Sequence, residues 1–360
     1  ISTNKLTPMK ILKLLLLALA LSTLFFSCNK EESSVFPLAN EHNIDGEKLE
    51  VAYDYAESIN GLGALIVEKD NVVIAERYFG NYTDESFFNI RSITKSITSI
   101  LTGIAIDKEI IGSVDQKISY FIGDQIETTD PDKLNISIYH ALTMSAGLYW
   151  NEWDYTNGFY NSYVVAPSQV NFLFNQDIVH TPGQVFTYNS ALPHMLSIII
   201  DEHSGLNTLD FAKQNLFQPL GIDTLDWYIF NNGYFNGGGD IIMRPKDLVK
   251  IGRLMINGGS YQGNQLVSSS WVDESTSNYI STNNSTPHGP NYAYWWWLGS
   301  SDGKNFYWGN GYGGQFLICI PEKNTVIVAN SNHANTGKTA SELWGQIEYL
   351  IMNKVIPCIN

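Results

Sequence analysis

Positive charge is scarce in this sequence. Its 360 residues include 21 Lys and Arg against 36 Asp and Glu, which gives a formal net charge of −15 and a sequence pI near 4.8. No basic stripe is available to neutralise phosphate groups, so the composition argues against a nucleic-acid partner. Charged residues make up only 16% of the chain and hydrophobic residues 44%, which favours a compact globular protein over a disordered one.

Cysteine is scarce as well. The chain has 3 cysteines, of which Cys28 lies in the N-terminal leader, Cys319 in an expected strand and Cys358 in the C-terminal tail. An oxidising compartment would permit a disulfide between the last two, but the sequence does not place them within bonding distance. We expect two unpaired structural thiols.

Two catalytic signatures are missing. The histidines show no H-E-x-x-H or similar ligand spacing, so we expect no metal site and no cofactor. The pattern G-x-S-x-G occurs at 299–303, but in the turn-like SSDGK and not in a strand-to-helix elbow, which leaves a Ser-His-Asp triad without its usual nucleophile turn. His194 and His203 lie in an apolar helical segment and are expected to be structural groups.

The N-terminal leader has the features of a targeting segment. Met9, Lys10 and Lys13 give a basic start, and ILKLLLLALALSTLFF gives an apolar run that ends at Cys28. The segment 1–28 resembles a bacterial lipoprotein signal, although a membrane-spanning anchor is the alternative. The following CNKEES is similar to surface-export signals of some Gram-negative groups. We therefore expect a lipoprotein of a Gram-negative cell envelope, in the periplasm or on the outer-membrane surface, held to the membrane by a lipid anchor at Cys28.

The pattern after residue 28 predicts a tether at 29–44 and a single domain at 45–356. Helices are expected at 49–59, after Ser92, and at about 336–353; a hairpin at 63–80; strands between about 293 and 331; and a mostly helical block, about 110–290. The fold class is therefore α/β (α+β), with an antiparallel sheet built from N- and C-terminal strands, flanked by helices, and an inserted helical subdomain.

The stretch NIRSITKSITSILTGIAIDK, residues 89–108, places Ser92 and Lys95 on one face of a helix at i and i+3. A lysine at the start of such an apolar helix is costly unless it has a partner or a task. The same spacing recurs at Ser2–Lys5, Ser27–Lys30 and Ser301–Lys304, but only Ser92 begins an apolar helix.

A serine hydroxyl is a weak nucleophile until a base takes its proton. Lys95 becomes a plausible base for Ser92 if burial lowers its pKa. The structural alternative is an N-terminal capping serine beside a lysine whose ammonium reaches solvent.

Two further segments carry candidate residues. In HTPGQVFTYNSALPHMLS, Tyr188 stands between a β-like run and a buried helix, so it is either a hydrogen-bonded core residue or a proton shuttle beside Lys95, whose charge would ease ionisation of the phenol. In FYWGNGYGGQFLICIPE, four glycines surround Asn310 and Tyr312. A flexible hairpin turn is one explanation, and close approach of the strand to a ligand is the other.

These three segments, in this order, resemble the serine β-lactamase and penicillin-binding-protein-like superfamily. More narrowly they are similar to the class C β-lactamase-related hydrolases, near the 6-aminohexanoate-dimer hydrolase and esterase branch. The resemblance covers roughly residues 50–350 and includes HALTMSAGLYWNEW, PGQVFTYNS and GYGGQ.

The resemblance implies an acyl-enzyme hydrolase of an ester or amide, with a small-molecule or peptide substrate. Ser92 would be the acylated nucleophile, Lys95 its base and Tyr188 the proton relay. Ser190 and Asn310 would support the site. The strand Gly309–Gly311 would place the Tyr312 amide as the second oxyanion donor beside the amide of Ser92, with Gly311, Gly313 and Gly314 around it.

Two departures from the family pattern bear on the substrate. Ser190 stands where β-lactamases of this type have Asn, and the strand lysine that helps to bind a β-lactam carboxylate is missing. We therefore expect an esterase, peptidase or amide hydrolase rather than a true β-lactamase. The alternative is a non-catalytic or slowly acylated protein of the same fold that binds peptide or cell wall. The aromatic stretches 150–163 and 291–299 are expected to pack the core or to wall the substrate cleft.

Overall fold

The protein is described here by a computed structural model that covers residues 35–154, 158–283, 286, 288–334 and 336–360. The predicted lipoprotein signal, the lipidation site Cys28 and residues 29–34 of the predicted tether lie outside these residues. Within the described part of the chain, no helix combines the length and the apolar character that crossing a bilayer requires.

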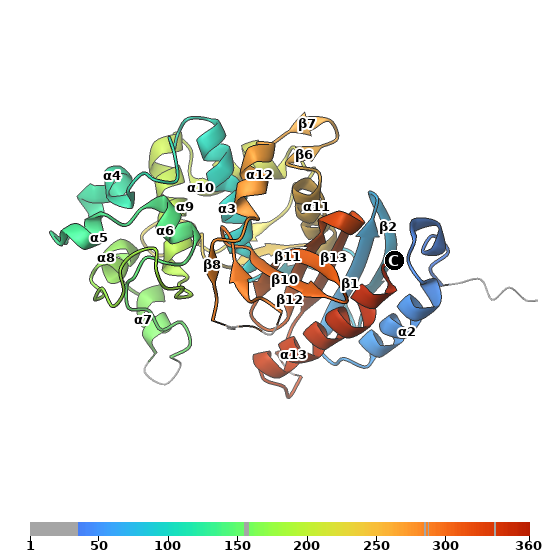
Figure 1. Ribbon diagram of the computed structural model, residues 1–360. Helices are drawn as coiled ribbons and strands as arrows, with labels where there is room; N and C mark the ends of the chain where they lie inside the picture. Colours follow the sequence, from blue (N-terminus) through green and yellow to red (C-terminus); the bar gives the residue numbers. More distant parts are fainter. Residues whose placement is uncertain (1–34, 155–157, 284–285, 287, 335) are drawn as a thin grey trace, which may run out of the picture.

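The main elements follow the chain in the order helix, hairpin, helical block and strands (Figure 1). Their bounds are α2 Gly46–Glu57, β1 Leu62–Lys69, β2 Val72–Tyr78, β3 Phe88–Asn89, α3 Ile93–Asp107, α4 Ile118–Ile122, α5 Pro131–Leu134, α6 Ile138–Leu142, α7 Phe159–Val164, α8 Gln169–Phe174, α9 Ala191–Ser204, α10 Thr208–Ala212, β4 Asp226–Trp227, β5 Ile241–Met243, α11 Pro245–Ile256, β6 Ser260–Tyr261, β7 Asn264–Gln265, α12 Ser269–Ser275, β8 Ile280–Ser281, β9 Asn291–Tyr292, β10 Trp297–Ser301, β11 Lys304–Gly311, β12 Gln315–Ile320, β13 Thr325–Ser331 and α13 Ala340–Leu350.

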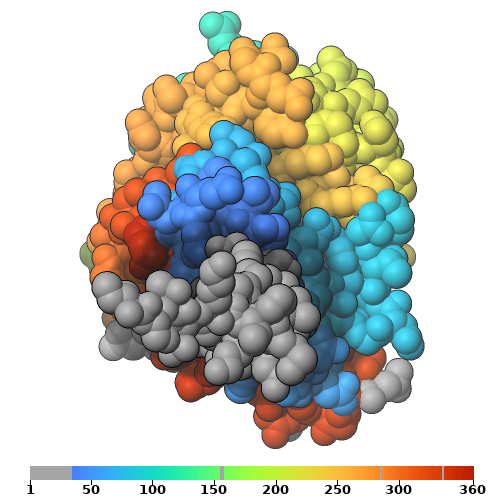
Figure 2. Space-filling model, turned by 90° about the vertical axis from the view of Figure 1, so that its right-hand side faces the viewer, coloured from blue at the N-terminus to red at the C-terminus, as the bar shows by residue number. Residues whose placement is uncertain are grey.

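One large antiparallel sheet joins the two ends of the chain. Its strand order is β2-β1-β13-β12-β11-β10-β9-β8, so the N-terminal hairpin pairs with the last strand through β1 and β13. Figure 2 shows the same union on the surface, where the blue N-terminal segment borders red and orange C-terminal residues. The prediction of an antiparallel sheet built from both ends and flanked by helices is confirmed.

The two faces of the sheet are covered by different helices. On β12, Leu317 lies close to Gly252 of α11, whereas the neighbouring Phe316 packs on Trp344 of α13 at 5.8 Å between ring centroids. Successive strand residues point to opposite faces, so α11 and α13 lie on opposite sides of the sheet. The helix α3 also contacts β11 and β12, which brings its N-terminus to the sheet.

The block at 110–290 is less uniformly helical than the sequence predicts. Helices α4 to α10 occupy it and lie to the left of the sheet in Figure 1, but α11 packs on the sheet against β12 and β13. Short strands also occur there: β5 pairs with both β3 and β4, and β8 extends the main sheet. Such two- and three-residue strands are set by their partners and are too short to show a periodic pattern.

The expected strand AYWWWLG is interrupted. β9 ends at Tyr292 and β10 begins at Trp297, and Trp295 between them has a φ of 62°. Trp295 and Trp296 are fully buried, so their apolar character reflects core packing rather than a continuous strand.

Cys319 and Cys358 are both free and buried, which confirms the prediction of two unpaired thiols. The two histidines also behave as predicted. Buried His194 lies with Nδ1 3.1 Å from the Phe235 carbonyl, and burial lowers its pKa to about 3. His203 Nε2 lies 2.9 Å from the Phe121 carbonyl.

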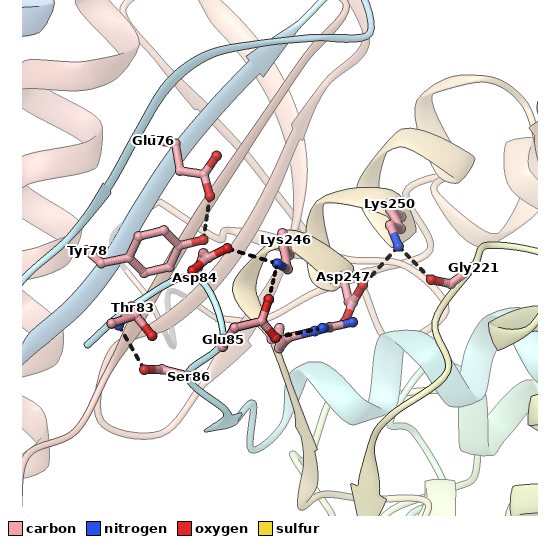
Figure 3. A network of polar contacts seen from close by, with 11 residues as sticks. Glu76, Tyr78, Thr83, Asp84, Glu85, Ser86, Gly221, Lys246, Asp247 and Lys250 are labelled. Carbon is pink, nitrogen blue, oxygen red and sulfur yellow. Dashed lines mark hydrogen bonds and ion pairs between the residues drawn. The ribbon is translucent and has the colours of Figure 1, made fainter. Parts of the chain in front are cut away.

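A polar network fastens the loop between β2 and β3 to α11 (Figure 3). Lys246 Nζ contacts Glu85 at 2.8 Å and Asp84 at 3.2 Å, and the backbone N–H of Thr83 donates to Ser86 Oγ at 2.9 Å. On the same helix, Lys250 Nζ donates to Asp247 at 2.9 Å and to the Gly221 carbonyl at 2.8 Å. The contacts of Lys246 join the stretch of chain that leads into β3 and Ser92 to α11.

Candidate active site

Ser92 stands at the entrance to α3, directly after a strained residue. Arg91 has a φ of 53°, in the left-handed region that residues with a Cβ rarely adopt, and Ser92 follows as the N-cap of α3. The Ser92 hydroxyl makes no capping bond to the helix. Its side chain is therefore not used as an N-terminal cap, which is the structural alternative that the sequence left open.

Lys95 lies on the first turn of α3 and faces Ser92. Its Nζ is 2.9 Å from Ser92 Oγ, and the side chain is only 1% exposed. Burial lowers the pKa of Lys95 to about 8, although the negative charges of Glu152 and Asp240 act in the opposite direction. A lysine with a pKa of about 8 is neutral in about half of the molecules at pH 8 and in about a tenth at pH 7, and the neutral form is the one that can act as a general base.

A glycine-rich loop, residues 236–240, holds Lys95 from the other side. Lys95 Nζ donates to the Gly238 carbonyl at 2.6 Å, and Thr98 Oγ1 donates to the Gly237 carbonyl at 2.8 Å. A Cβ on Gly238 would lie 2.2 Å from the Ser190 carbonyl, so the loop approaches this close only because it lacks side chains. A neutral amine that donates to Gly238 can turn its lone pair toward Ser92.

Tyr188 lies beside this pair. Lys95 Nζ is 5.0 Å from the centroid of the Tyr188 ring, which is half-buried and nearly parallel to Trp153 (6.1 Å, 13°) and Trp297 (5.8 Å, 24°). Burial, followed by the charge of Glu152, raises the pKa of Tyr188, while a hydrogen bond with Ser92 lowers it. The net direction opposes the expectation that Lys95 eases ionisation. The phenol is held neutral and is suited to donate a proton.

Ser190 is held by a carboxylate that the sequence did not single out. The Ser190 hydroxyl donates to Glu152 Oε1, and the Ser190 backbone N–H donates to Glu152 Oε2 at 3.1 Å. Trp150 Nε1 donates to the same oxygen at 2.6 Å. The departure from the family's Asn at this position is thus matched by a glutamate on segment 150–153.

The four glycines around Asn310 serve two purposes. A Cβ on Gly309 would lie 3.1 Å from Ile93 of α3, and one on Gly311 would lie 2.5 Å from the Ile90 carbonyl, so β11 passes close to the start of α3. Gly313 and Gly314 have φ angles of 83° and 102° and form the β11–β12 turn. The flexible-turn explanation therefore fits Gly313 and Gly314, whereas Gly309 and Gly311 allow β11 to approach the start of α3 rather than a ligand.

Tyr312 directly follows the close contact between Gly311 and Ile90. Its side chain is 44% exposed and meets His333 edge-on at 5.6 Å, so the ring lies at the surface of the turn. Asn310 Oδ1 accepts a hydrogen bond from Trp344 Nε1 at 2.7 Å, which fastens the strand to α13.

The structure thus brings Ser92, Lys95, Tyr188 and Ser190 together and runs β11 past them. Sequence reasoning missed Glu152, Gly238 and Asp240. The run Asn236–Asp240, with three consecutive glycines, was a readable signal for a loop in close contact. Glu152 was visible only as a carboxylate between two tryptophans.

Within the described residues, no group of three or more His, Cys, Asp or Glu side chains could hold a metal ion. The polar groups around Ser92 and Lys95 are a phenol, hydroxyls, backbone carbonyls and the carboxylates of Glu152 and Asp240.

The family model for beta-lactamase matches residues 47–350 of the chain. The protein therefore belongs to the beta-lactamase family, part of the serine β-lactamase and penicillin-binding-protein-like superfamily, and the resemblance read from its motifs is confirmed.

The relatives to which the chain is similar include named hydrolases. The 6-aminohexanoate-dimer hydrolase of Paenarthrobacter ureafaciens is 25% identical over 296 residues, which cover 75% of this chain and 72% of the relative. Among solved structures, EstCE1, a hydrolase with promiscuous acyltransferase activity, superposes with a TM-score of 0.72 at 14% identity, over 88% of this chain and 100% of EstCE1. A penicillin-binding protein from Bacillus halodurans gives 0.65 at 17% identity, over 83% and 99%. At these identities the structures establish the fold alone.

Proposed function

We propose that the protein is a serine hydrolase that cleaves an ester or amide through an acyl-enzyme on Ser92. The observation that carries this proposal is the 2.9 Å contact between Ser92 Oγ and the amine of a buried lysine whose pKa is about 8. A buried cation without a task would be a net cost to folding. The names of the relatives, a 6-aminohexanoate-dimer hydrolase and a hydrolase with promiscuous acyltransferase activity, support the same class of reaction.

In the first half-reaction, neutral Lys95 takes the proton of Ser92 as Oγ bonds to the substrate carbonyl carbon. The carbonyl electrons move to oxygen, where the backbone N–H groups of Ser92 and Tyr312 are proposed to stabilise the negative charge. Tyr188 then donates its proton to the departing oxygen or nitrogen as that bond breaks, and regains a proton from the Lys95 ammonium. A water molecule repeats the sequence in reverse and releases the acid.

The charges around the site favour a neutral or cationic substrate over an anionic drug. Asp240 is paired with Arg91 at 3.0 Å, whereas Glu152 accepts only neutral donors from the described residues. The strand position that carries lysine in β-lactamases belongs here to Gly309. We infer that the protein lacks the electrostatic anchor for a β-lactam carboxylate and acts on another ester or amide.

The test compares the protein with its Ser92→Ala variant on a short-chain p-nitrophenyl ester, with intact mass recorded during turnover. We expect activity to fall by at least about 10⁴-fold in the variant and an acyl adduct on Ser92 in the parent. Equal background rates without an adduct would overturn the proposal and favour a non-catalytic peptide- or cell-wall-binding role for the same fold.

A further inference from the structure

Segment 150–153 contacts the turn that carries Tyr188 through hydrogen bonds and an aromatic ring. Glu152 accepts hydrogen bonds from both the hydroxyl and the backbone N–H of Ser190, two residues beyond Tyr188. Trp150 Nε1 donates to the same carboxylate at 2.6 Å, and Trp153 stacks on the Tyr188 ring at 6.1 Å. One four-residue segment therefore contacts the catalytic turn through a carboxylate and through an aromatic face.

The contacts of Glu152 fix the turn at its backbone. Ser190 is the N-cap of α9, yet its hydroxyl does not cap that helix and instead donates a hydrogen bond to Glu152. The positive end of the α9 dipole favours a carboxylate at this place. Because charge-assisted hydrogen bonds are the stronger kind, the carboxylate restrains Ser190 and, through the chain, the position of Tyr188.

Glu152 also differs electrostatically from the second acidic group near the lysine. Asp240 faces Lys95 too, but it pairs with Arg91 at 3.0 Å and accepts from Asn89 at 2.8 Å. Glu152 receives only neutral donors among the described residues. Its charge therefore acts on the groups around it without local compensation.

The other titratable groups facing this cluster are phenols. The charge of Glu152 acts on Tyr188 and also on Tyr160, Tyr163 and Tyr292, and the surroundings of Tyr160 include Asp240 and Arg91 as well. Burial raises the pKa of all these phenols, so they stay neutral over the working pH range. Glu152 and Asp240 are consequently the groups that set the field at Lys95.

We propose that Glu152 is a positioning residue of this site: it locks the Tyr188–Ser190 turn against segment 150–153 and supplies an unpaired negative charge opposite Lys95. This inference rests on the proposed hydrolase function and adds to it a role for a carboxylate. It predicts that the two effects of Glu152, on the position of the turn and on the charge near Lys95, can be separated by mutation. Gln keeps the shape of the Glu side chain but not its charge, whereas Ala keeps neither the shape nor the charge.

The positional part is tested with two acetate esters of different leaving groups. Glu152→Ala should reduce kcat/KM for phenyl acetate about tenfold more than for p-nitrophenyl acetate, because the poorer leaving group needs the Tyr188 proton more. In a Tyr188→Phe background, Glu152→Ala should add no further leaving-group dependence, as a double-mutant cycle requires of two residues that act through one another. Equal losses on both esters, or an additive effect in the Tyr188→Phe background, would overturn the positional role.

The electrostatic part is tested by the pH dependence of Ser92 labelling with a fluorophosphonate probe, followed by intact mass. Removing the negative charge in Glu152→Gln destabilises the Lys95 ammonium, so the rising acid limb should move to lower pH by roughly one unit. Glu202→Gln is the control for loss of a carboxylate charge, since Glu202 also accepts from a hydroxyl, that of Tyr234, at the end of α9 opposite to Ser190. An unmoved limb in Glu152→Gln would overturn the electrostatic role.

The two readouts also separate this inference from the function on which it rests. If the parent protein cleaves neither ester but Ser92 is labelled, the hydrolase proposal falls, and the acid limb of labelling alone decides for or against Glu152. Failure of the parent to be labelled by the fluorophosphonate, with the fold intact by circular dichroism, would overturn both. Unchanged melting temperatures in the Glu152 variants exclude loss of folding as the cause of any effect.

Discussion

The two sides of the proposed active site are built in different ways. On the nucleophile side, Ser92 and Lys95 lie one turn apart on a single buried helix, and their 2.9 Å contact follows from helical spacing. On the proton-donor side, Tyr188 precedes α9 and is placed by Trp153, Trp297 and Glu152, from segments far apart in the chain. The first side is a local structure, and the second is an assembly of loops.

This difference teaches how the parts of the site can vary. A pair of residues encoded by the spacing of one helix survives changes elsewhere as long as the helix stays buried. A group held by aromatic faces and one carboxylate depends on every loop that contributes a contact. We expect substitutions on the nucleophile side to act on the chemical step, and those on the aromatic side to act on substrate binding or on proton donation.

The largest effect should come from Lys95→Ala, which removes the proposed base and leaves the Ser92 hydroxyl unactivated. We expect kcat/KM for a p-nitrophenyl ester to fall by about 10³-fold or more, measured at pH 8 by absorbance. Lys69→Ala is the matched control, because Lys69 is also buried but donates to the Lys323 carbonyl at 2.5 Å, at the far end of β1. Full activity in Lys95→Ala would remove the lysine from the mechanism.

Gly311→Ala should be the next most damaging change. Its Cβ would lie 2.5 Å from the Ile90 carbonyl and 2.7 Å from Gln315, so β11 must move away from the start of α3. Displacing one oxyanion donor costs about 10²–10³-fold in kcat in comparable enzymes, and we expect a loss of that order here. Gly345→Ala on α13 is the control, since nothing lies within 4 Å of its Cβ, and should stabilise the protein by about 0.5–1 kcal/mol with activity unchanged. A fully active Gly311→Ala would contradict the placement of the second oxyanion donor.

The pH dependence sharpens the comparison because only the nucleophile side titrates near neutrality. With a Lys95 pKa of about 8, kcat/KM should rise through pH 8 and fall about tenfold for each pH unit below the limb. The measurement is kcat/KM from pH 6 to pH 10 at constant ionic strength. A limb near pH 4 to 5 would instead assign the base to a carboxylate.

The same pKa predicts a stability change of defined sign. The folded protein holds Lys95 at about 8 and the unfolded chain at 10.5, so between these values the unfolded chain binds more protons. Stability therefore rises with pH across this window, and the cost of the buried amine is fully present below about 8. Urea unfolding of the parent and of Lys95→Met should show the parent gaining relative to the variant from pH 8 to pH 10.5. A constant difference would mean that the lysine has the same pKa in both states.

On the aromatic side, Trp153→Ala should have a smaller effect. Trp153 is 58% exposed and stacks on Tyr188, so its loss removes an aromatic neighbour of Tyr188 without removing a reacting group. We expect KM for an aryl ester to rise about three- to tenfold, with kcat within about twofold, since stacking between two aromatic rings is worth roughly 1 kcal/mol. Tyr120→Ala is the control for loss of an exposed aromatic, at 75% exposure on α4. A selective fall in kcat would place Trp153 in the chemical step.

The smallest effect should come from the network in Figure 3. Lys246 contacts Asp84 and Glu85, but both carboxylates are more than half exposed, so their ion pairs are screened by solvent. We expect Lys246→Ala to lower the free energy of unfolding by about 0.2–1 kcal/mol, measured by urea, and to leave kcat/KM unchanged. A loss of activity would show that the β2–β3 loop transmits its position to Ser92.

Much of the fold was predictable because it is written in local patterns. The hairpin of β1 and β2 follows from strand alternation and from its turn residues Asp70 and Asn71, which both have a positive φ. Helix α9 follows from helical spacing and from Gly205, which ends it in the left-handed conformation. The two-residue strands β4 and β8 could not be predicted, because so short a segment becomes a strand only when its neighbours offer hydrogen bonds.

The sequence by itself determined that Ser92 and Lys95 meet, since their spacing and the apolar stripe of α3 require only a helix and its burial. Only the tertiary structure decided what surrounds the pair. It placed the Gly238 carbonyl against the amine, set the charge of Glu152 opposite it, and kept Tyr188 neutral by burial. The physical reason is range: helical spacing is fixed within one turn, whereas desolvation and charge depend on every segment that the fold brings to the same place.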